Sequence, residues 1–342
     1  MSGFAFPAGR RLDLLCLGRA GVDLYAQQAG VALEQVASFR KSVGGSPANI
    51  ATGLARLGGR AGILSAVSDD GFGRYVRAFL MANGVDVQGL LTAPAGARNS
   101  TAFTEMRPED CQVIIYRQGA ADLCLQPTDL DAGLIASSRA LLVTGTALSE
   151  SPSREASLHA MNLARRAGTQ VVLDLDYRPY GWRDTAQAAV YLRVACSMAD
   201  MVIGNREEFD VLETLQPEHA GNRERHAERD AARDDQHSAR QVLHGVTQAA
   251  VVKDGRHGCR VFLQDGQAFR QGVFAVNARK PFGSGDAFAA ALLWGLLQGL
   301  DWPQALRQGA AAAAINVSRD ACAEAMATHA ELAAFLPTQP LA

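Results

Sequence analysis

The sequence predicts an α/β protein whose parallel sheet carries helices on both faces. Short apolar runs of strand length alternate with longer runs of helical length along most of the chain, and this alternation is typical of a doubly wound sheet. Glycine-rich turns join several of these runs, as at Gly44-Gly45 and Gly283-Ser284-Gly285. No linker divides the 342 residues, so we expect a single domain over residues 1–342.

Composition narrows the function classes. The chain is 48% hydrophobic and 20% charged, with a formal net charge of −2, so it has no global basic field that would attract nucleic acid. The six cysteines are scattered without a C-x-x-C pair or a Cys/His cluster, which argues against zinc. We see no signal peptide and no apolar run that could span a bilayer. We therefore expect a cytoplasmic protein that binds neither nucleic acid nor membranes.

The N-terminal third combines a buried strand with segments that interrupt the α/β pattern. A strand is predicted at 12–18, and Asp23 follows its end. Ligand contacts gather at such ends in α/β proteins, although a turn aspartate fits equally well. A β-hairpin pattern falls within about 99–118. Together with about 19–43 it predicts a small second sheet that could act as a lid.

Between these two segments lies the motif Val43-Gly44-Gly45-Ser46-Pro47-Ala48-Asn49. Ser46 is a suitable N-cap and Pro47 a preferred first residue of a helix that runs to about Leu57. Asn49 falls in the first turn of that helix. The two glycines allow close approach to the backbone, so the motif favours a ligand site over an ordinary capped turn.

Further strands are predicted with helices between them, at 140–144, 170–175, 200–204 and 249–253. Polar side chains that suit ligand contacts follow these strands, namely Arg178, Asn205, Glu208 and Lys253. Because the carboxyl ends of parallel strands share one edge of a sheet, we expect these groups to converge. A segment at about 216–236 mixes charges of both signs without an apolar stripe, which indicates a solvated insertion.

The chain is organised around a glycine turn that opens a helix. An apolar strand is predicted at 271–276, the turn at 283–285, and a helix from Ala287 to Leu297. Backbone N–H groups and the helix dipole favour an anion at such a start. Asp286 in the first turn suits a base that takes a proton from a hydroxyl as it attacks a phosphoryl group. A glycine-rich cap with a favourably placed aspartate is the simpler alternative.

Taken together, these groups suit phosphoryl transfer, where positioning and charge stabilisation do most of the catalysis. The chain lacks the G-x-x-x-x-G-K-S/T motif of P-loop enzymes. It also lacks G-x-G-x-x-G after its first strand, which disfavours a nicotinamide-binding domain, and it lacks the G-x-S-x-G elbow of hydrolases.

Three motifs resemble signatures of the ribokinase-like (PfkB) carbohydrate kinases. Residues 43–49 resemble the N-terminal signature of that family, Phe282-Gly283-Ser284-Gly285-Asp286-Ala287-Phe288 resembles the C-terminal one, and Asn205-Arg206-Glu207-Glu208 resembles the Asn-x-x-Glu motif. The order and spacing agree over nearly the whole chain. The resemblance implies a three-layer α/β/α sandwich of eight or nine strands with a small β-sheet lid. It also implies transfer of the ATP γ-phosphoryl group to a sugar hydroxyl with Mg²⁺.

The resemblance further implies a role for each matching residue. Asp286 would be the base, and the anion hole would be the backbone of Gly283, Ser284 and Gly285. Glu208, with Asn205, would organise Mg²⁺ and the phosphates. The sugar would be held by Asp23, Gly44, Gly45 and Asn49. ATP would contact Asn205, Lys253, Gly255, Gly258 and Asn316.

Other segments resemble family members that phosphorylate a keto acid, 5-dehydro-2-deoxy-D-gluconate, to its 6-phosphate in myo-inositol degradation. They include Gly18-Arg19-Ala20 and Asp174-Leu175-Asp176-Tyr177-Arg178. Arg178 and Arg117 are candidate partners for the carboxylate of such a substrate, although each could be a surface arginine. The alternatives left open are 2-dehydro-3-deoxygluconate, another sugar, or a ligand-binding sensor built on a kinase fold.

One position departs from the family pattern. Many members carry an aspartate six residues before the base, in a segment that binds a monovalent cation, and this chain has Lys280 there. The lysine ammonium group could occupy the place of the ion, or Lys280 could lie on the surface. We expect activity with little dependence on K⁺. A homodimer through an exposed edge of the lid also remains open.

Overall fold

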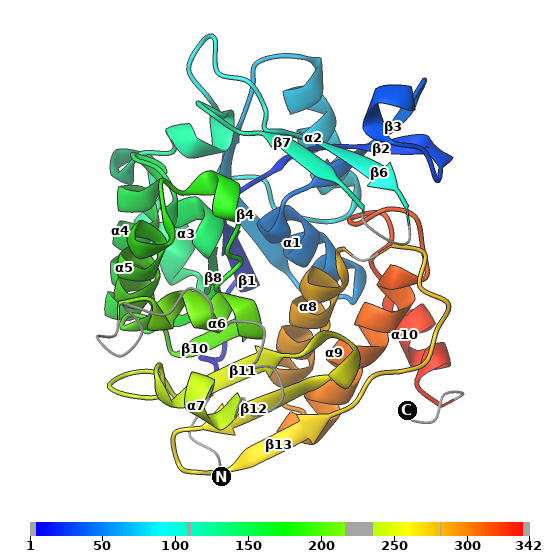
Figure 1. The fold of residues 1–342 in the computed structure, drawn as a ribbon. Helices are drawn as coiled ribbons and strands as arrows, with labels where there is room; N and C mark the ends of the chain where they lie inside the picture. Colours follow the sequence, from blue (N-terminus) through cyan, green and yellow to red (C-terminus); the bar gives the residue numbers. More distant parts are fainter. Residues whose placement is uncertain (1–4, 108–110, 216–234, 281, 338–342) are drawn as a thin grey trace.

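The computed structural model describes residues 5–107, 111–215, 235–280 and 282–337. The strands of its main sheet are β1 (Leu12–Leu17), β4 (Ala61–Val67), β5 (Leu90–Thr92), β8 (Ser138–Thr144), β9 (Gln170–Asp174), β10 (Met201–Asn205), β11 (Ala249–Lys253), β12 (Cys259–Leu263) and β13 (Ala268–Gln271). They are ordered β13-β12-β11-β10-β9-β8-β1-β4-β5 (Figure 1). Neighbours from β11 to β5 are parallel, and β12 and β13 add an antiparallel edge. The predicted parallel sheet is confirmed.

Helices cover both faces of this sheet. One face carries α1 (Ser46–Arg56), α2 (Gly71–Ala82), α8 (Ser284–Leu297) and α9 (Trp302–Val317), with α10 (His329–Phe335) packed on α9. The other carries α3 (Ala132–Ala136), α4 (Ser153–Arg166), α5 (Thr185–Cys196), α6 (Arg206–Glu213) and α7 (Asp235–Arg240). The result is the predicted α/β/α arrangement of three layers.

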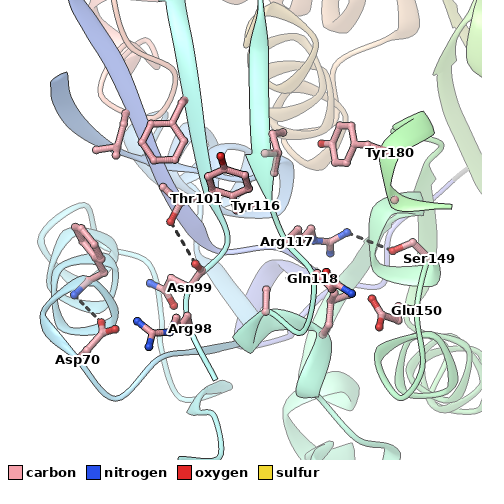
Figure 2. Close-up of a pocket in the computed structure, with 17 residues that line it drawn as sticks. Asp70, Arg98, Asn99, Thr101, Tyr116, Arg117, Gln118, Ser149, Glu150 and Tyr180 are labelled. Atoms are coloured by element: carbon pink, nitrogen blue, oxygen red, sulfur yellow. Dashed lines mark hydrogen bonds between the residues drawn. The ribbon is translucent and has the colours of Figure 1, made fainter. Parts of the chain in front are cut away.

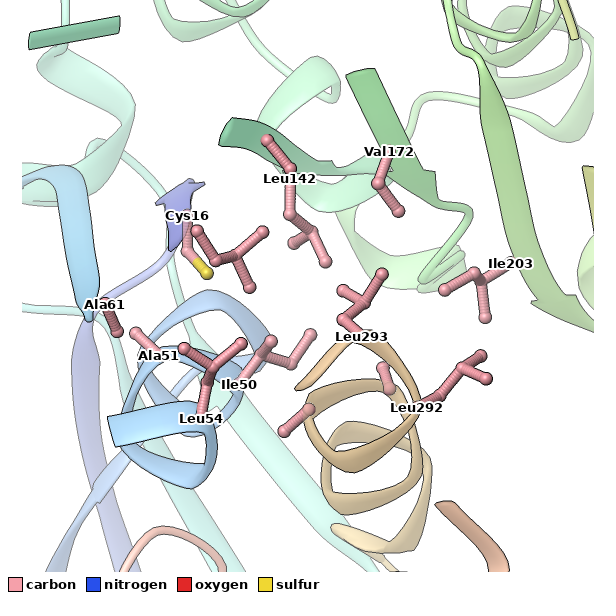
Figure 3. Close-up of a cluster of buried hydrophobic side chains, with 14 of the residues drawn as sticks. Cys16, Ile50, Ala51, Leu54, Ala61, Leu142, Val172, Ile203, Leu292 and Leu293 are labelled. Carbon is pink, nitrogen blue, oxygen red and sulfur yellow. The ribbon is translucent and has the colours of Figure 1, made fainter. Parts of the chain in front are cut away.

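The core explains why the strands are apolar on both sides. Along β1, Leu14 and Cys16 pack toward one layer of helices, while Leu15 and Leu17 pack toward the other. Figure 3 shows the first of these clusters, where side chains of the sheet face those of α1 and α8. Alternate residues of a strand point to opposite faces. A strand buried on both faces therefore reads as a continuous apolar run.

A second sheet of four strands lies at one end of the molecule (Figure 1). Its strands are β2 (Gly21–Ala29), β3 (Phe39–Gly44), β6 (Thr101–Met106) and β7 (Val113–Tyr116), in the order β3-β2-β6-β7. The two segments predicted to form a small sheet thus both contribute strands. Asp23 and Tyr25 of β2 line the cavity where this sheet meets the main one, whereas Leu24, on the opposite face of β2, packs against the core cluster of the main sheet.

The strand predicted at 271–276 is wrong, because β13 ends at Gln271 and residues 272–276 form no strand. Phe274 instead leaves the sheet edge and is buried against Phe335, with ring centroids 5.4 Å apart. The charged insertion predicted at about 216–236 lies outside the described residues except for its last two positions. Within the described ranges, no helix is long and apolar enough to cross a membrane.

Candidate active site

A cavity of about 570 Å³ opens where the carboxyl ends of the parallel strands meet the small sheet. Most residues that the sequence singled out line this cavity, namely Asp23, Gly45, Asn49, Arg178, Asn205, Glu208, Lys253, Gly255, Gly283, Ser284, Gly285 and Asp286. They come from loops and helix starts that the parallel topology brings to one edge. We therefore take this cavity as the candidate active site.

Asp286 lies where two helices begin. It is in the first turn of α8, whose N-cap is Gly283 with φ of 87°, a value that glycine adopts without strain. Its carboxylate accepts hydrogen bonds from Ser46 Oγ at 2.6 Å and Asn49 Nδ2 at 2.7 Å, both in the first turn of α1. Asn49 is thus placed as predicted. Ser46 is not the N-cap of α1, because Gly45 takes that position and the Ser46 hydroxyl bonds to Asp286.

The pKa of Asp286 lies above its usual value. Burial is the largest cause, and the negative charge of Asp176 adds to it, while the hydrogen bonds from Ser46 and Asn49 act in the opposite direction. A raised pKa suits a general base, because a carboxylate with the ordinary value holds a proton too weakly near neutral pH.

The glycine pair of the N-terminal motif makes room for side chains of the small sheet. A Cβ on Gly44 would lie 2.0 Å from Asp23 Oδ1, and a Cβ on Gly45 would lie 2.3 Å from the Arg19 carbonyl oxygen. The glycines therefore let Asp23 and Arg19 pack against the start of α1. The sequence predicted that a ligand approaches the backbone closely at this motif. In the structure, the groups that approach the two glycines belong to Asp23 and Arg19.

Buried charges of both signs line the far side of the cavity. Lys253 Nζ lies 3.4 Å from Asp174 Oδ1. Burial raises the pKa of Asp174 to about 7 against the opposing effect of Lys253. Burial alone would lower the pKa of Lys253, but the charges of Asp174 and Glu208 raise it. Asp174 was not singled out by the sequence as a site residue, although its place at the end of β9 was a usable signal.

The Asn205–Glu208 pair forms a capping box at the start of α6. Asn205 Oδ1 accepts from the Glu208 N–H, and Glu208 Oε2 accepts from the Asn205 N–H, both at 2.8 Å. Burial raises the pKa of Glu208. Its second oxygen, Oε1, lies 3.6 Å from Arg178 Nη1, and both residues line the cavity. Within the part of the chain that the structure describes, no group of three acidic, histidine or cysteine side chains could hold a metal by itself.

A second cavity of about 350 Å³ adjoins the start of α8. Lys253, Gly255 and Gly258 line it, as do Ser284 and Gly285, and its walls are mainly apolar. Three predicted nucleotide contacts are therefore brought together here. Asn316 is fully buried and lines neither cavity, which argues against direct contact between Asn316 and a ligand.

Lys280 is buried behind the glycine turn, at 3% exposure. Its Nζ donates to the Phe282 carbonyl oxygen at 2.7 Å and to Asn316 Oδ1 at 2.6 Å. Burial lowers the pKa of Lys280. Of the two placements that the sequence left open, the structure therefore has the interior one, with the ammonium group joining the turn to α9.

The two arginines expected to meet a substrate carboxylate lie in different surroundings. Arg178 lines the candidate active site, with Nη2 at 2.8 Å from Asp176 Oδ1. Arg117 instead borders a third cavity of about 830 Å³ (Figure 2). Its Nε and Nη2 both bond to Asp122 Oδ2, and its Nη1 bonds to the Thr146 carbonyl oxygen. The structure therefore does not bring Arg117 into the cavity that holds Asp286.

Comparisons with known proteins agree with this geometry. The model of the pfkB family carbohydrate kinases matches residues 11–329. The chain belongs to the pfkB family of carbohydrate kinases. It is 48% identical, over 99% of both chains, to a 5-dehydro-2-deoxygluconokinase of Photobacterium profundum. The PfkB protein of a Polaromonas species has a similar structure, with a TM-score of 0.79 and 28% identity over 94% of this chain and 99% of that one.

A further structural neighbour is a putative ribokinase II of E. coli in complex with ATP and Mg²⁺. Its TM-score is 0.83 at 21% identity, with 95% of this chain and 99% of that chain covered, so it supports the fold. The ribokinase-like fold predicted from the sequence is confirmed, and the chain is a carbohydrate kinase.

Sequence reasoning missed several side chains that complete the site. Tyr25 stacks on Phe282 with ring centroids 5.6 Å apart and an interplanar angle of 6°, and its hydroxyl donates to Asp23. Asp176 adopts φ of 32°, which is uncommon for a residue with a side chain. It accepts from Thr146 Oγ1 at 3.0 Å. These contacts depend on tertiary packing, so no local sequence pattern predicts them.

Proposed function

We propose that this pfkB kinase transfers the γ-phosphoryl group of ATP to the terminal hydroxyl of 5-dehydro-2-deoxy-D-gluconate. The observation that carries the proposal is the carboxylate of Asp286, held at the N-terminus of α8 and lining the same cavity as Asp23, Asn49 and Lys253. The near full-length identity to a relative named for this substrate supports the choice of acid. The place of the reaction in myo-inositol degradation stays a prediction.

The roles of the residues follow from their positions. Asp286 would accept the proton of the attacking hydroxyl, while Ser46 and Asn49 keep its carboxylate oriented. The first N–H groups of α8 would hold the phosphoryl oxygens, since no side chain caps that helix start among the described residues. Lys253 would add positive charge on the same side.

The described residues fit ATP and Mg²⁺. The apolar second cavity lies beside the start of α8 and suits a nucleotide base. Mg²⁺ keeps several waters and is usually held by one or two carboxylates plus phosphate oxygens, so Glu208, which lines the cavity, suffices on the protein side. When bound, the metal neutralises phosphate charge.

The test is an assay of ADP release with Mg²⁺ and ATP on four acceptors. They are 5-dehydro-2-deoxygluconate, 2-dehydro-3-deoxygluconate, fructose and ribose. We expect clear preference for the first, and a loss of at least about 100-fold in kcat for Asp286→Asn. Preference for another acceptor would refute the substrate but keep the kinase. No turnover with any acceptor would favour the sensor alternative.

We also propose that two copies pair through the outer face of the small sheet. This face carries Phe103, Ile114 and Tyr116, of which Ile114 is 43% and Tyr116 65% exposed. Apolar patches of this kind mark association surfaces. Light scattering should give the mass of a dimer for the wild type and of a monomer for Tyr116→Asp. Val190→Asp on α5, at a position 45% exposed, is the matched control, and a monomeric wild type would refute the pairing.

A further inference from the structure

The candidate active site contains an arginine that no sequence motif assigned to a role. Arg19 follows β1 and lines the cavity that holds Asp286. Its side chain is 10% exposed. The Nε donates to Ser100 Oγ at 2.7 Å, and Nη2 donates to Asp23 Oδ1 at 3.0 Å. The remaining nitrogen, Nη1, has no hydrogen-bond partner among the described residues.

The surroundings of Arg19 are shaped to hold it. A Cβ on Gly21 would lie 3.0 Å from Arg19 Nη2 and 2.4 Å from Ser100 Oγ, and a Cβ on Gly45 would lie 3.0 Å from Arg19 Cγ. Two glycines thus leave space for the guanidinium and its stem. A fixed arginine loses little conformational entropy when it binds an anion, and its planar fork suits a carboxylate.

Arg19 forms an ion pair with Asp23 through Nη2 alone, and the other basic groups near the cavity differ from it in position or in the number of their carboxylate partners. Arg117 is neutralised by Asp122 and borders a different cavity. Arg178 lies against two carboxylates, Asp176 at 2.8 Å and Glu208 at 3.6 Å. The Glu208 side of the cavity is also where Lys253 and the start of α8 would hold phosphate. The carboxylate and the reacting hydroxyl lie at opposite ends of the acceptor. When the hydroxyl faces the phosphate, the carboxylate therefore has to lie away from the phosphate side of the cavity.

A chain of contacts connects Asp286 to Arg19, and both residues line the cavity. Asp286 bonds to Ser46, the preceding Gly45 packs on Arg19, and Arg19 bonds to Asp23. A six-carbon keto acid with its reacting hydroxyl at Asp286 would extend along this line. We propose that Arg19 recognises the carboxylate of the acceptor and so selects an acid over a neutral sugar. This inference rests on the proposed acid substrate.

The test compares Arg19→Met, Arg19→Lys and the wild type on two acceptors, the keto acid and its uncharged C1 amide. Calorimetric Kd values and steady-state KM and kcat are measured for each. Loss of a charge-assisted hydrogen bond should weaken binding of the acid to the Arg19→Met enzyme by about 10- to 100-fold, which corresponds to about 1.4–2.7 kcal/mol. The KM for the amide and for ATP should change by less than about 3-fold, a shift of under 1 kcal/mol. Arg19→Lys should fall between the two.

Arg183→Met, at a position whose side chain is 77% exposed, is the matched control, and melting curves verify that each variant is folded. If Arg19→Met keeps the wild-type ratio of acid to amide affinity, Arg19 does not read the carboxylate, while the proposed substrate stands. Equal weakening of acid and amide would show that Arg19 acts through Asp23, which also overturns the inference. A wild type that binds acid and amide equally would refute the acid substrate itself.

Discussion

Replacing Lys280 by methionine tests whether Lys280 positions the glycine turn before α8 or has no role in catalysis. The change removes two hydrogen bonds from a charged donor, each about 1.5–3 kcal/mol, but it also removes the cost of burying an ammonium group, which is several kcal/mol. These two contributions largely offset each other. What remains is Asn316 Oδ1, buried without its donor at a cost of about 1–3 kcal/mol. We expect the free energy of unfolding to fall by that amount.

The effect on turnover should exceed the effect on binding. Lys280 holds the Phe282 carbonyl, and the next residue is the N-cap of α8. Displacement of reacting groups by about 1 Å can lower a rate by about 100-fold, so we expect kcat to fall by about 10- to 100-fold. The KM for the acceptor should change little, because Lys280 lines the second cavity and not the one that holds Asp286.

The assay measures kcat, KM and urea unfolding for Lys280→Met beside Arg279→Met, whose side chain is 59% exposed. Each enzyme is assayed with and without added K⁺ or NH₄⁺. The activity of the wild type should respond little to the added ion, because the lysine ammonium group already occupies the place of a monovalent cation. The Lys280→Met enzyme should regain part of its activity when the ion is added. Strong activation of the wild type by K⁺, or a fully active and stable Lys280→Met enzyme, would refute this reasoning.

Three further predictions concern the same site. Ser46→Ala removes a hydrogen bond that lowers the pKa of Asp286, so the acid limb of the kcat–pH profile should move up by roughly 1 unit; an unmoved limb would contradict Asp286 as base. The pKa of Asp174 is raised to about 7, so its native state binds more protons than the unfolded state above pH 4, and stability falls as pH rises toward 7. Urea unfolding of Asp174→Asn should show roughly 2 kcal/mol less loss between pH 5 and 7, and an unchanged slope would exclude this titration. Tyr25→Leu should lower stability by about 1 kcal/mol and raise the acceptor KM a few-fold, whereas Tyr25→Phe should retain the stack on Phe282 and lose only the hydrogen bond to Asp23; equal effects of the two would argue against the stack.

Patterns that are local in sequence predicted much of the molecule. The alternation of apolar runs gave the parallel sheet, because strand and helix periodicities are readable over a few residues. The glycine turn before Asp286 and the Pro47 helix start were readable for the same reason. The prediction of a strand at 271–276 was wrong because a short apolar run can either pair at a sheet edge or pack against a helix. Phe274 packs against Phe335 of α10.

Partners that are distant in sequence were not predictable. Arg117 and Arg178 both lie near strand ends, yet Arg178 lines the site, whereas Arg117 borders another cavity and donates to the Thr146 carbonyl oxygen, 29 residues away. Ser46 looked like an N-cap because serine at a helix start usually is one, but Gly45 caps the helix and the hydroxyl serves Asp286. In each case the deciding contact is tertiary.

The carboxylates of the site explain which one is suited to act as base. Five carboxylates and three basic side chains line the cavity. Asp23, Asp174, Asp176 and Glu208 each lie within ion-pair distance of a basic side chain. Glu208 accepts a backbone N–H in its capping box. Burial raises the pKa of Asp286, as it does for Asp174 and Glu208, and the hydrogen bonds to Asp286 come from the uncharged donors Ser46 and Asn49. A carboxylate oriented by neutral groups keeps more of its proton affinity than one that faces a cation. Held at the start of α8, where a phosphoryl group can bind, it is therefore the carboxylate best placed to receive the proton of an attacking hydroxyl.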